Sequence, residues 1–162
     1  MSLNFSVDDK EVREALDRLI DSVKNPKKAL KAIGAYVRAS TQLRFRNSIK
    51  PDGSPWAPVK RGGKPLVDTG RLRDSITYEV GETFVDIGTN VVYAPYCQFG
   101  TKPHEIKAKP GSGLFWPGAR HPMKSVQHPG TEAREYLGFN DEDKQETLNL
   151  INDFLKAAAE GK

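Results

Sequence analysis

Apolar side chains recur at helical spacing near both ends of this chain, and the recurrence limits the folds open to it. Near the N-terminus, a stripe at the i, i+3, i+4, i+7 spacing predicts an amphipathic helix over residues 9–23. Asp8 and Glu11 are spaced as in a capping box at its start. The apolar members of the stripe are Val12, Ala15, Leu16, Leu19, Ile20 and Val23.

Two further helices are expected. One begins at Pro26, behind Asn25 as its N-cap, and ends near Ser48. Its inward residues are expected to be Leu30, Ile33, Tyr36, Val37 and Leu43. The other follows Asn140, an N-cap with three acidic residues in the next turn, and it continues to the C-terminal region. Its apolar stripe consists of Leu148, Ile151, Phe154 and Leu155.

The middle of the chain predicts strands and loops. "SITYEV" (75–80) and "TFVDIG" (83–88) alternate as two strands around the turn "GE". The apolar segment "VVYAPYCQFG" (91–100) predicts a third strand, in which Pro95 marks a bulge or an edge. In the Pro/Gly-rich segment 102–130, "HEIKAK" and "LFWPG" could pair as a hairpin, and the remainder is expected to be an exposed loop.

The predicted fold class is therefore α+β, with two N-terminal helices and a C-terminal helix on a small, mainly antiparallel sheet. A chain of 162 residues is expected to form a single domain, 1–162, with 102–130 as an extended loop or hairpin within it. The Pro/Gly-rich loop at 50–65 contains Trp56, whose ring is expected to pack on the domain. No apolar run is long enough for a membrane span, and no secretory signal precedes the first helix. These features, with one cysteine, predict assembly in a reducing cytoplasm.

Charge is unevenly distributed along the chain. Residues 24–73 contain thirteen basic and two acidic side chains, whereas residues 131–162 contain eight acidic and four basic ones. Three interpretations stay open: contact with nucleic-acid phosphates, head-to-tail packing of identical subunits, and a solvated helix face. The residues proposed for phosphate or partner contact are Arg38, Arg44, Arg46, Lys60, Arg61 and Lys64.

No motif organises a catalytic site, so the chain is predicted not to be an enzyme and to need no cofactor. Cys97 is the obvious nucleophile, but no helix N-terminus or adjacent base is expected there to lower its pKa. A zinc site is disfavoured because Cys97, His104, His121 and His128 lack paired short spacings. The segment "KRGGKP" (60–65) lacks the frame of a P-loop. An enzyme that uses Cys97 is kept as a third hypothesis.

Four blocks, in order, resemble the virion morphogenesis family of tailed bacteriophages, which includes Mu-like tail completion and head–tail joining proteins. They are "GSPWAPVK", "LVDTGRLRDSI", "VDIGTNVVYAPYCQFGT" and "AREYLGFNDED", the last of which precedes the final helix. The chain departs from the family pattern at Cys97, where the family often has His, and at Glu135, where it often has Pro. The family-motif residues carried over as assembly residues are Trp56, Asp68, Thr69, Gly70, Arg71, Leu72, Arg73, Ser75, Gly88, Tyr93, Ala94, Gln98, Phe99, Gly100 and Arg134.

The resemblance implies a structural protein that forms a homo-oligomeric ring at the neck or tail of the virion after assembly in the host cytoplasm. Its expected partners are copies of itself and other neck, tail or capsid proteins, with non-specific DNA contact as a further possibility. No membrane and no small-molecule substrate are expected. The alternative is a basic DNA-binding accessory protein that works alone. In the family interpretation, Asp68 to Gly70 form a tight turn, Leu72 and Ile76 anchor it, and Arg71 and Arg73 point outward to partners.

Overall fold

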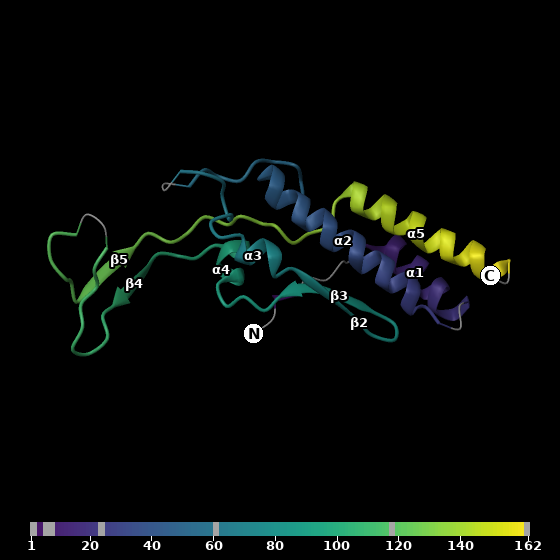
Figure 1. Cartoon of the computed structure of the whole chain (residues 1–162), viewed down its shortest axis with the longest axis horizontal. Coiled ribbons are helices and arrows are strands. Elements are labelled where there is room, and N and C mark those ends of the chain that lie inside the picture. The colour runs from purple at the N-terminus through teal and green to yellow at the C-terminus, as the bar shows by residue number, and fades with distance from the viewer. Residues whose placement is uncertain (1–2, 5–8, 23–24, 60–61, 117–118, 161–162) are drawn as a thin grey trace.

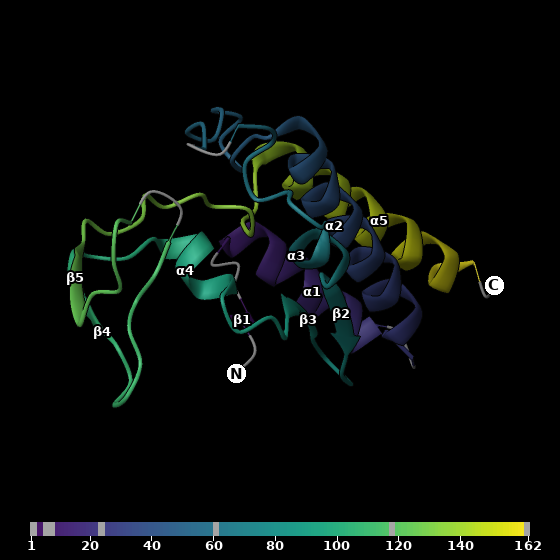
Figure 2. The same cartoon turned by 60° about the vertical axis from the view of Figure 1, so that its left-hand side comes forward.

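Three long helices pack at one end of the molecule, and a narrow β-hairpin projects from the other (Figures 1 and 2). This computed structural model describes residues 3–4, 9–22, 25–59, 62–116 and 119–160. Helices α1 (Lys10–Ser22), α2 (Lys27–Asn47) and α5 (Asp141–Ala159) are the three predicted from apolar periodicity. Helix α5 packs against both α1 and α2. The α+β prediction is confirmed.

The helix starts follow the expected capping chemistry in part. The Asn140 side chain accepts a hydrogen bond from the Asp143 amide at 2.8 Å, and the Asp143 carboxylate accepts one from the Asn140 amide at 3.2 Å, which completes a capping box. Asn25 accepts from the Lys27 amide at 3.1 Å, but the N-cap of α2 is Pro26, one residue after the predicted one. At α1 the described cap is Asp9, which accepts from the Glu11 and Val12 amides. Asp8, predicted to cap this helix, lies outside the described residues, as does Val23.

A three-stranded antiparallel sheet lies against α2. Its strands are β1 (Leu3–Asn4), β2 (Thr77–Val80) and β3 (Val85–Thr89), in the order β1-β3-β2. Strand β1 was not predicted from the sequence. Gly34 allows α2 to approach the sheet closely, because a Cβ there would lie 2.6 Å from the Tyr78 ring. The β2–β3 connection is wider than the predicted two residues, since Val80 pairs with Val85.

The core joins the helices to the sheet and to a central aromatic cluster. Phe45 of α2 lies edge-on to Trp56, with ring centroids 5.4 Å apart, and tilted to Tyr136 at 5.2 Å. All three side chains are buried, so the predicted packing of Trp56 is confirmed. Leu43, predicted to face inward, is 49% exposed and lies on the outer side of α2.

The segment 91–100 corrects the sequence prediction, because it forms helix α4 (Ala94–Phe99) rather than a third strand. Pro95 lies in the first turn of this helix, where its missing amide hydrogen has no intrahelical partner to lose. The short helix α3 (Arg71–Asp74) precedes β2. The sheet contains no strand from this region.

The predicted hairpin exists, but with a different partner strand. Strand β4 (His104–Lys107) falls within "HEIKAK", yet it pairs with β5 (Ser125–His128) and not with "LFWPG". Residues 101–131, named the arm below, project from the body beside α4 (Figure 1). In the part of the chain that the structure describes, no helix has the length and apolar run that a membrane crossing requires.

Candidate assembly surface

The "DTGRLR" block forms a turn that leads directly into α3. Gly70 has φ of 83°, a left-handed conformation that favours glycine, and the Thr69 hydroxyl accepts from the Arg71 amide at 3.4 Å. Leu72 is buried in the core. Asp68 lies exposed in the same turn. The block therefore sets the direction of the chain as it enters the sheet.

Ser75 links this turn to the end of β3. Its hydroxyl donates to the Leu72 carbonyl at 2.7 Å and lies 2.6 Å from the Thr89 hydroxyl. The Thr89 hydroxyl accepts from the Val91 amide, so the same network fixes the path toward α4. Gly88 is buried in β3 opposite Thr77. These motif residues position α4.

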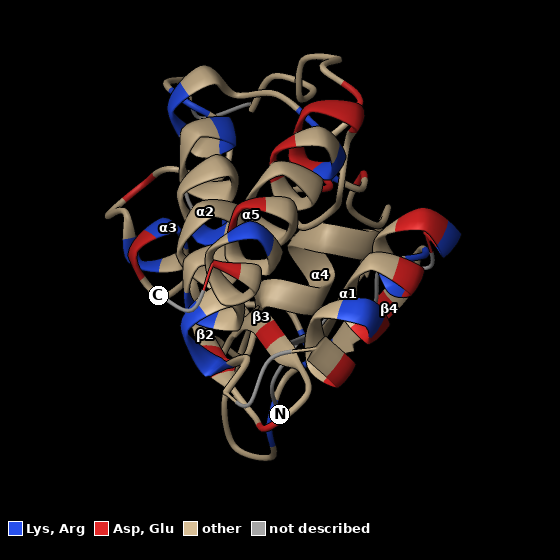
Figure 3. Cartoon of the chain, turned by 90° about the vertical axis from the view of Figure 1, so that its right-hand side faces the viewer, with Lys and Arg blue, Asp and Glu red and all other residues tan. Residues whose placement is uncertain are grey.

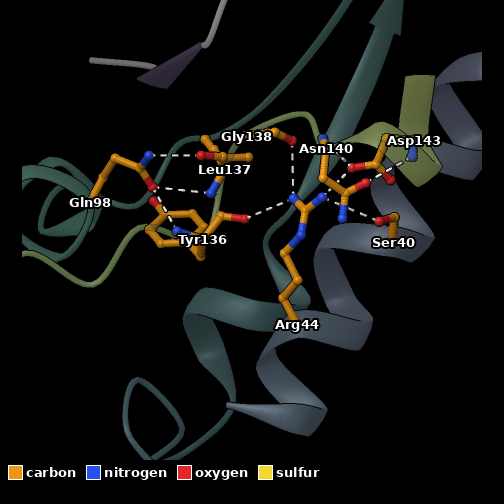
Figure 4. Close-up of polar contacts among 8 residues, drawn as sticks. All are labelled: Ser40, Arg44, Gln98, Tyr136, Leu137, Gly138, Asn140 and Asp143. Atoms are coloured by element: carbon orange, nitrogen blue, oxygen red, sulfur yellow. Dashed lines mark hydrogen bonds and ion pairs between the residues drawn. The ribbon is translucent and has the colours of Figure 1, made fainter. Parts of the chain in front are cut away.

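Gln98 holds α4 against the segment that leads to α5. Its side-chain oxygen accepts from the amides of Tyr136 and Leu137 at 2.9 and 3.0 Å, and its amide nitrogen donates to the Leu137 carbonyl at 2.8 Å (Figure 4). Because Gln98 is buried, each of these bonds satisfies a backbone group that water does not reach. Ala94, fully buried, accepts the Tyr136 hydroxyl through its carbonyl.

The structure corrects one of the proposed phosphate contacts. Arg44 is only 3% exposed, so it cannot reach a nucleic-acid backbone. Its guanidinium pairs with the buried Asp143 carboxylate and donates to the carbonyls of Tyr136 (3.3 Å) and Gly138 (3.0 Å), as Figure 4 shows. Arg44 thus ties α2 to α5 and to residues 136–138, which precede α5. Sequence reasoning missed Asp143 as its partner and treated it only as a helix N-terminal acid.

Trp56 and Arg134 join the 50–59 loop to residues 134–135. The Trp56 indole donates to the Glu135 carbonyl at 2.8 Å. The Arg134 guanidinium donates to the carbonyls of Ala57 (3.0 Å) and Pro58 (3.3 Å). Residues 134–138, named the connector below, are therefore held by Trp56, Arg44 and Gln98 from three separate segments.

The connector matters because it lies where the arm returns to the body. The arm leaves after α4 at Gly100 and returns at Gly130, and Thr101 and Thr131 exchange backbone hydrogen bonds of 2.9 and 3.0 Å across its base. Both glycines have positive φ, and a Cβ on either would collide with the backbone of the opposite segment. The Arg134 amide then donates to the Cys97 carbonyl at 2.8 Å. The motif residues thus fix both ends of the arm.

Large apolar side chains are exposed on two parts of this region. The α4 patch comprises Val92, Tyr93, Tyr96 and Phe99, of which Val92 is 79% and Phe99 68% exposed. The arm patch comprises Phe115, Trp116 and Met123, beyond the paired strands of the arm. Tyr93 and Phe99 were expected to form the sheet, and they instead lie on the surface. Sequence reasoning did not single out the other members of the patches, although a contiguous apolar surface is a recognised mark of an interaction site.

The other basic candidates are dispersed. Arg46, Lys64 and Arg73 line a groove beside α2 together with the acidic Asp74 and Glu142. The guanidinium of Arg73 pairs with Asp74 at 2.7 Å, which raises the pKa of Arg73 and lowers that of Asp74. The acidic first turn of α5 lies at the same end of the helix pair as the basic last turn of α2 (Figure 3). This groove therefore has mixed charge.

Four further basic candidates remain, two of which the structure describes. The Arg38 guanidinium donates to the Ile76 carbonyl at 2.9 Å, and Arg71 is exposed on α3. Lys60 and Arg61 lie outside the described residues.

The described residues considered for catalysis or metal binding do not lie together in one site. Cys97 is half-buried in α4, and burial raises the pKa of its thiol, which disfavours the nucleophilic thiolate. His104 and His128 face each other across β4 and β5 with ring centroids 5.1 Å apart. Among the described residues, no group of three or more His, Cys, Asp or Glu side chains is arranged to hold a metal ion.

Comparison with known proteins places this architecture in context. A model of the phage virion morphogenesis family matches residues 7–156. The chain is 29% identical over 147 residues to the Mu-like prophage FluMu G protein 2 of Haemophilus influenzae, with 90% of each chain covered. It is 25% identical to the putative capsid assembly protein G of Escherichia phage Mu, with 98% of this chain and 97% of that protein covered. No solved structure matches.

Proposed function

Since the chain belongs to the phage virion morphogenesis family and is a structural protein of phage assembly, we propose that it is a tail completion or head–tail joining protein. In this proposal its copies form a ring at the neck or tail of the virion after assembly in the host cytoplasm. The ring connects capsid and tail through the surfaces of its subunits, without catalysis.

The observation that carries the proposal is the arm. Residues 101–131 leave the body through a base that is fixed on both sides, and they end in exposed aromatic side chains. All four residues of β4 are exposed and none of β5 is buried, so the paired strands of the arm enclose no core of their own. Apolar side chains gathered on an exposed projection are typical of an interaction site, where another surface covers them. Assembly provides that surface.

The arm also supports a role that depends on contact with other proteins rather than on a site within the chain. A structural protein needs surfaces that project toward its partners, and the motif residues hold the arm in one direction. The capsid assembly description of the phage Mu relative is in keeping with such a role.

A phage complementation experiment tests the proposal. The gene is inactivated in the phage or prophage that encodes it, and particles are examined by electron microscopy and plating. We expect capsids and tails that fail to join, and recovery when the intact chain is supplied. Complete, infectious particles without the protein would rule out the proposal.

The same complementation is repeated with a chain in which a short Gly/Ser linker between Thr101 and Thr131 replaces the arm. It should keep its helical circular dichroism spectrum and fail to restore joining. Full restoration by this variant would show that the arm is dispensable for the proposed role.

The stand-alone DNA-binding hypothesis is favoured by one specific observation. The arm contains five Lys or Arg residues and a single acid, Glu105. A DNA-binding role predicts that the chain retards duplex DNA at low salt and loses this binding steeply as salt rises. Replacing the arm lysines by neutral residues should then abolish the retardation of DNA, while virion assembly continues.

A further inference from the structure

We propose that the arm patch of one copy packs on the α4 patch of the next copy. This inference rests on the proposed function, in which copies of the chain assemble, and it names the surfaces that meet. The arm patch is Phe115, Trp116 and Met123, and the α4 patch is Val92, Tyr93, Tyr96 and Phe99.

The arm cannot cover the α4 patch of its own chain. Backbone pairing runs along the arm from the Thr101–Thr131 bridge, through β4 and β5, to the bond between Ala108 and Lys124. Seven extended steps separate Thr101 from Ala108, a span of about 23 Å. Figure 1 shows α4 at the base and β4 and β5 farther out, and the Leu114–Met123 bridge follows these strands, so the pairing holds the arm patch away from α4.

The exposed area is sufficient for a stable contact between copies. A large aromatic side chain has about 150–250 Å² to bury, and the patch members are roughly half exposed, so each offers on the order of 100 Å². The seven side chains together therefore offer about 700 Å² of apolar surface. Apolar atoms make up about 60% of a typical interface, which gives a total of about 1,200 Å². That value lies at the lower bound of specific, stable interfaces.

Charge favours contact between unlike patches over contact between two arms. The arm carries five basic side chains against Glu105, so two arms repel each other. Residues 90–101, which contain the α4 patch, carry no charged side chain. With Lys102 at its edge, the α4 patch repels an arm less than a second arm does, and the pairing is directional.

A shallow hollow beside the α4 patch can receive an aromatic anchor. Tyr96 lines it together with Thr101, Lys102, Pro103 and His104 at the start of the arm. Buried Trp and Tyr side chains seated in such hollows carry a large share of interface energy. We assign Trp116 as the anchor. Because the donor and acceptor surfaces differ, repetition of the contact joins copies head to tail and closes a ring when the rotation permits.

Paired cysteine variants test which surfaces meet. Both chains carry Cys97→Ala; one has Ala119→Cys, next to the intact Trp116, with one affinity tag, and the other has Lys102→Cys, in the hollow that the intact Tyr96 lines, with a second tag. They are mixed across a concentration series and treated with a short bis-maleimide. We expect covalent dimers that contain both tags, and at most traces of dimers with a single tag.

A matched pair of serine variants measures the energetic contribution. Trp116→Ser and Tyr96→Ser should each weaken self-association by at least about tenfold in native mass spectrometry or sedimentation, as for central interface residues. Phe84→Ser is the control, because Phe84 is a comparably exposed aromatic in the β2–β3 turn, outside both patches. It should leave self-association unchanged.

The outcomes separate this inference from the proposed function. Dimers with one tag, no cross-link at any concentration, or equal weakening by Phe84→Ser would overturn the pairing of arm and α4. Cross-links to another virion protein through the cysteine at position 119 would likewise assign the arm patch to that protein. The complementation experiment measures the joining of capsid and tail independently. The proposed function can therefore hold even when the pairing of the arm patch with the α4 patch does not.

Discussion

Replacement of Arg44 by methionine should destabilise the body of the protein more than any change to an exposed arginine. Methionine fills a similar length without a charge, and it leaves the buried Asp143 carboxylate without its cation. The carbonyls of Tyr136 and Gly138 lose a donor at the same time. The two helices and the connector that Arg44 joins then lose their shared contact.

The magnitude follows from the burial of both partners. Removing one member of a buried ion pair costs about 3–5 kcal/mol, because the remaining charge stays away from water. Typical domains have about 5–15 kcal/mol of total stability, so this is a large fraction of it. At about 2–4 °C per kcal/mol for a chain of this size, the Tm should fall by roughly 6–20 °C.

The assay is urea and thermal unfolding followed by circular dichroism. Arg46→Met is the matched control, since Arg46 is exposed on the same helix, and it should change stability by less than about 0.5 kcal/mol. Combining Arg44→Met with Asp143→Asn should recover part of the loss, because the carboxamide removes the orphaned charge and still accepts from the Asn140 amide. A loss below about 1 kcal/mol for Arg44→Met would refute the reasoning.

Three further outcomes are expected. Gln98→Leu should cost about 2–4 kcal/mol in urea unfolding, because two buried backbone amides lose their acceptor. Gly100→Ala should lower the Tm more than Gly111→Ala: both positions have positive φ, but only at Gly100 would a Cβ also strike the opposite backbone. Cys97 should be alkylated by iodoacetamide at least about tenfold more slowly in the folded than in the urea-unfolded chain at pH 8, since burial raises the pKa of its thiol, and the rate should rise with pH. Equal rates would restore the hypothesis of a reactive cysteine.

The long helices and the β2–β3 pair could be predicted because their signals are local. The stripe in 9–23 and the cap at Asn140 each lie within a few residues of the structure they specify. Segment 91–100 gave no such signal. It is apolar without alternation, and a short apolar run is equally compatible with a strand and a buried helix. Pro95 suits the first turn of a helix as well as an edge strand, so the sequence left both open.

Arg44 shows why counting charge along the chain misleads. It was grouped with its basic neighbours as a surface residue, although Val37 lies seven residues before it and faces the core. A position seven residues on from a buried one returns to the same side of a helix. The spacing therefore placed Arg44 inward. Its partner, Asp143, is 99 residues away, and nothing local to either residue identifies such a pairing.

The α4 patch lies within one of the blocks that carry the family resemblance, whereas the arm patch lies outside all of them. Gln98 and Trp56 are buried and hold backbone segments together, whereas Trp116 lies on the arm outside every quoted block. Buried polar contacts tolerate little change, because a lost partner leaves a group unsatisfied. An exposed patch needs only to match its neighbour. It follows that the motif residues specify how the arm is attached to the body, while the arm patch specifies what the arm contacts. Exchanging arms between relatives at Gly100 and Gly130 should therefore transfer the choice of partner without altering the body.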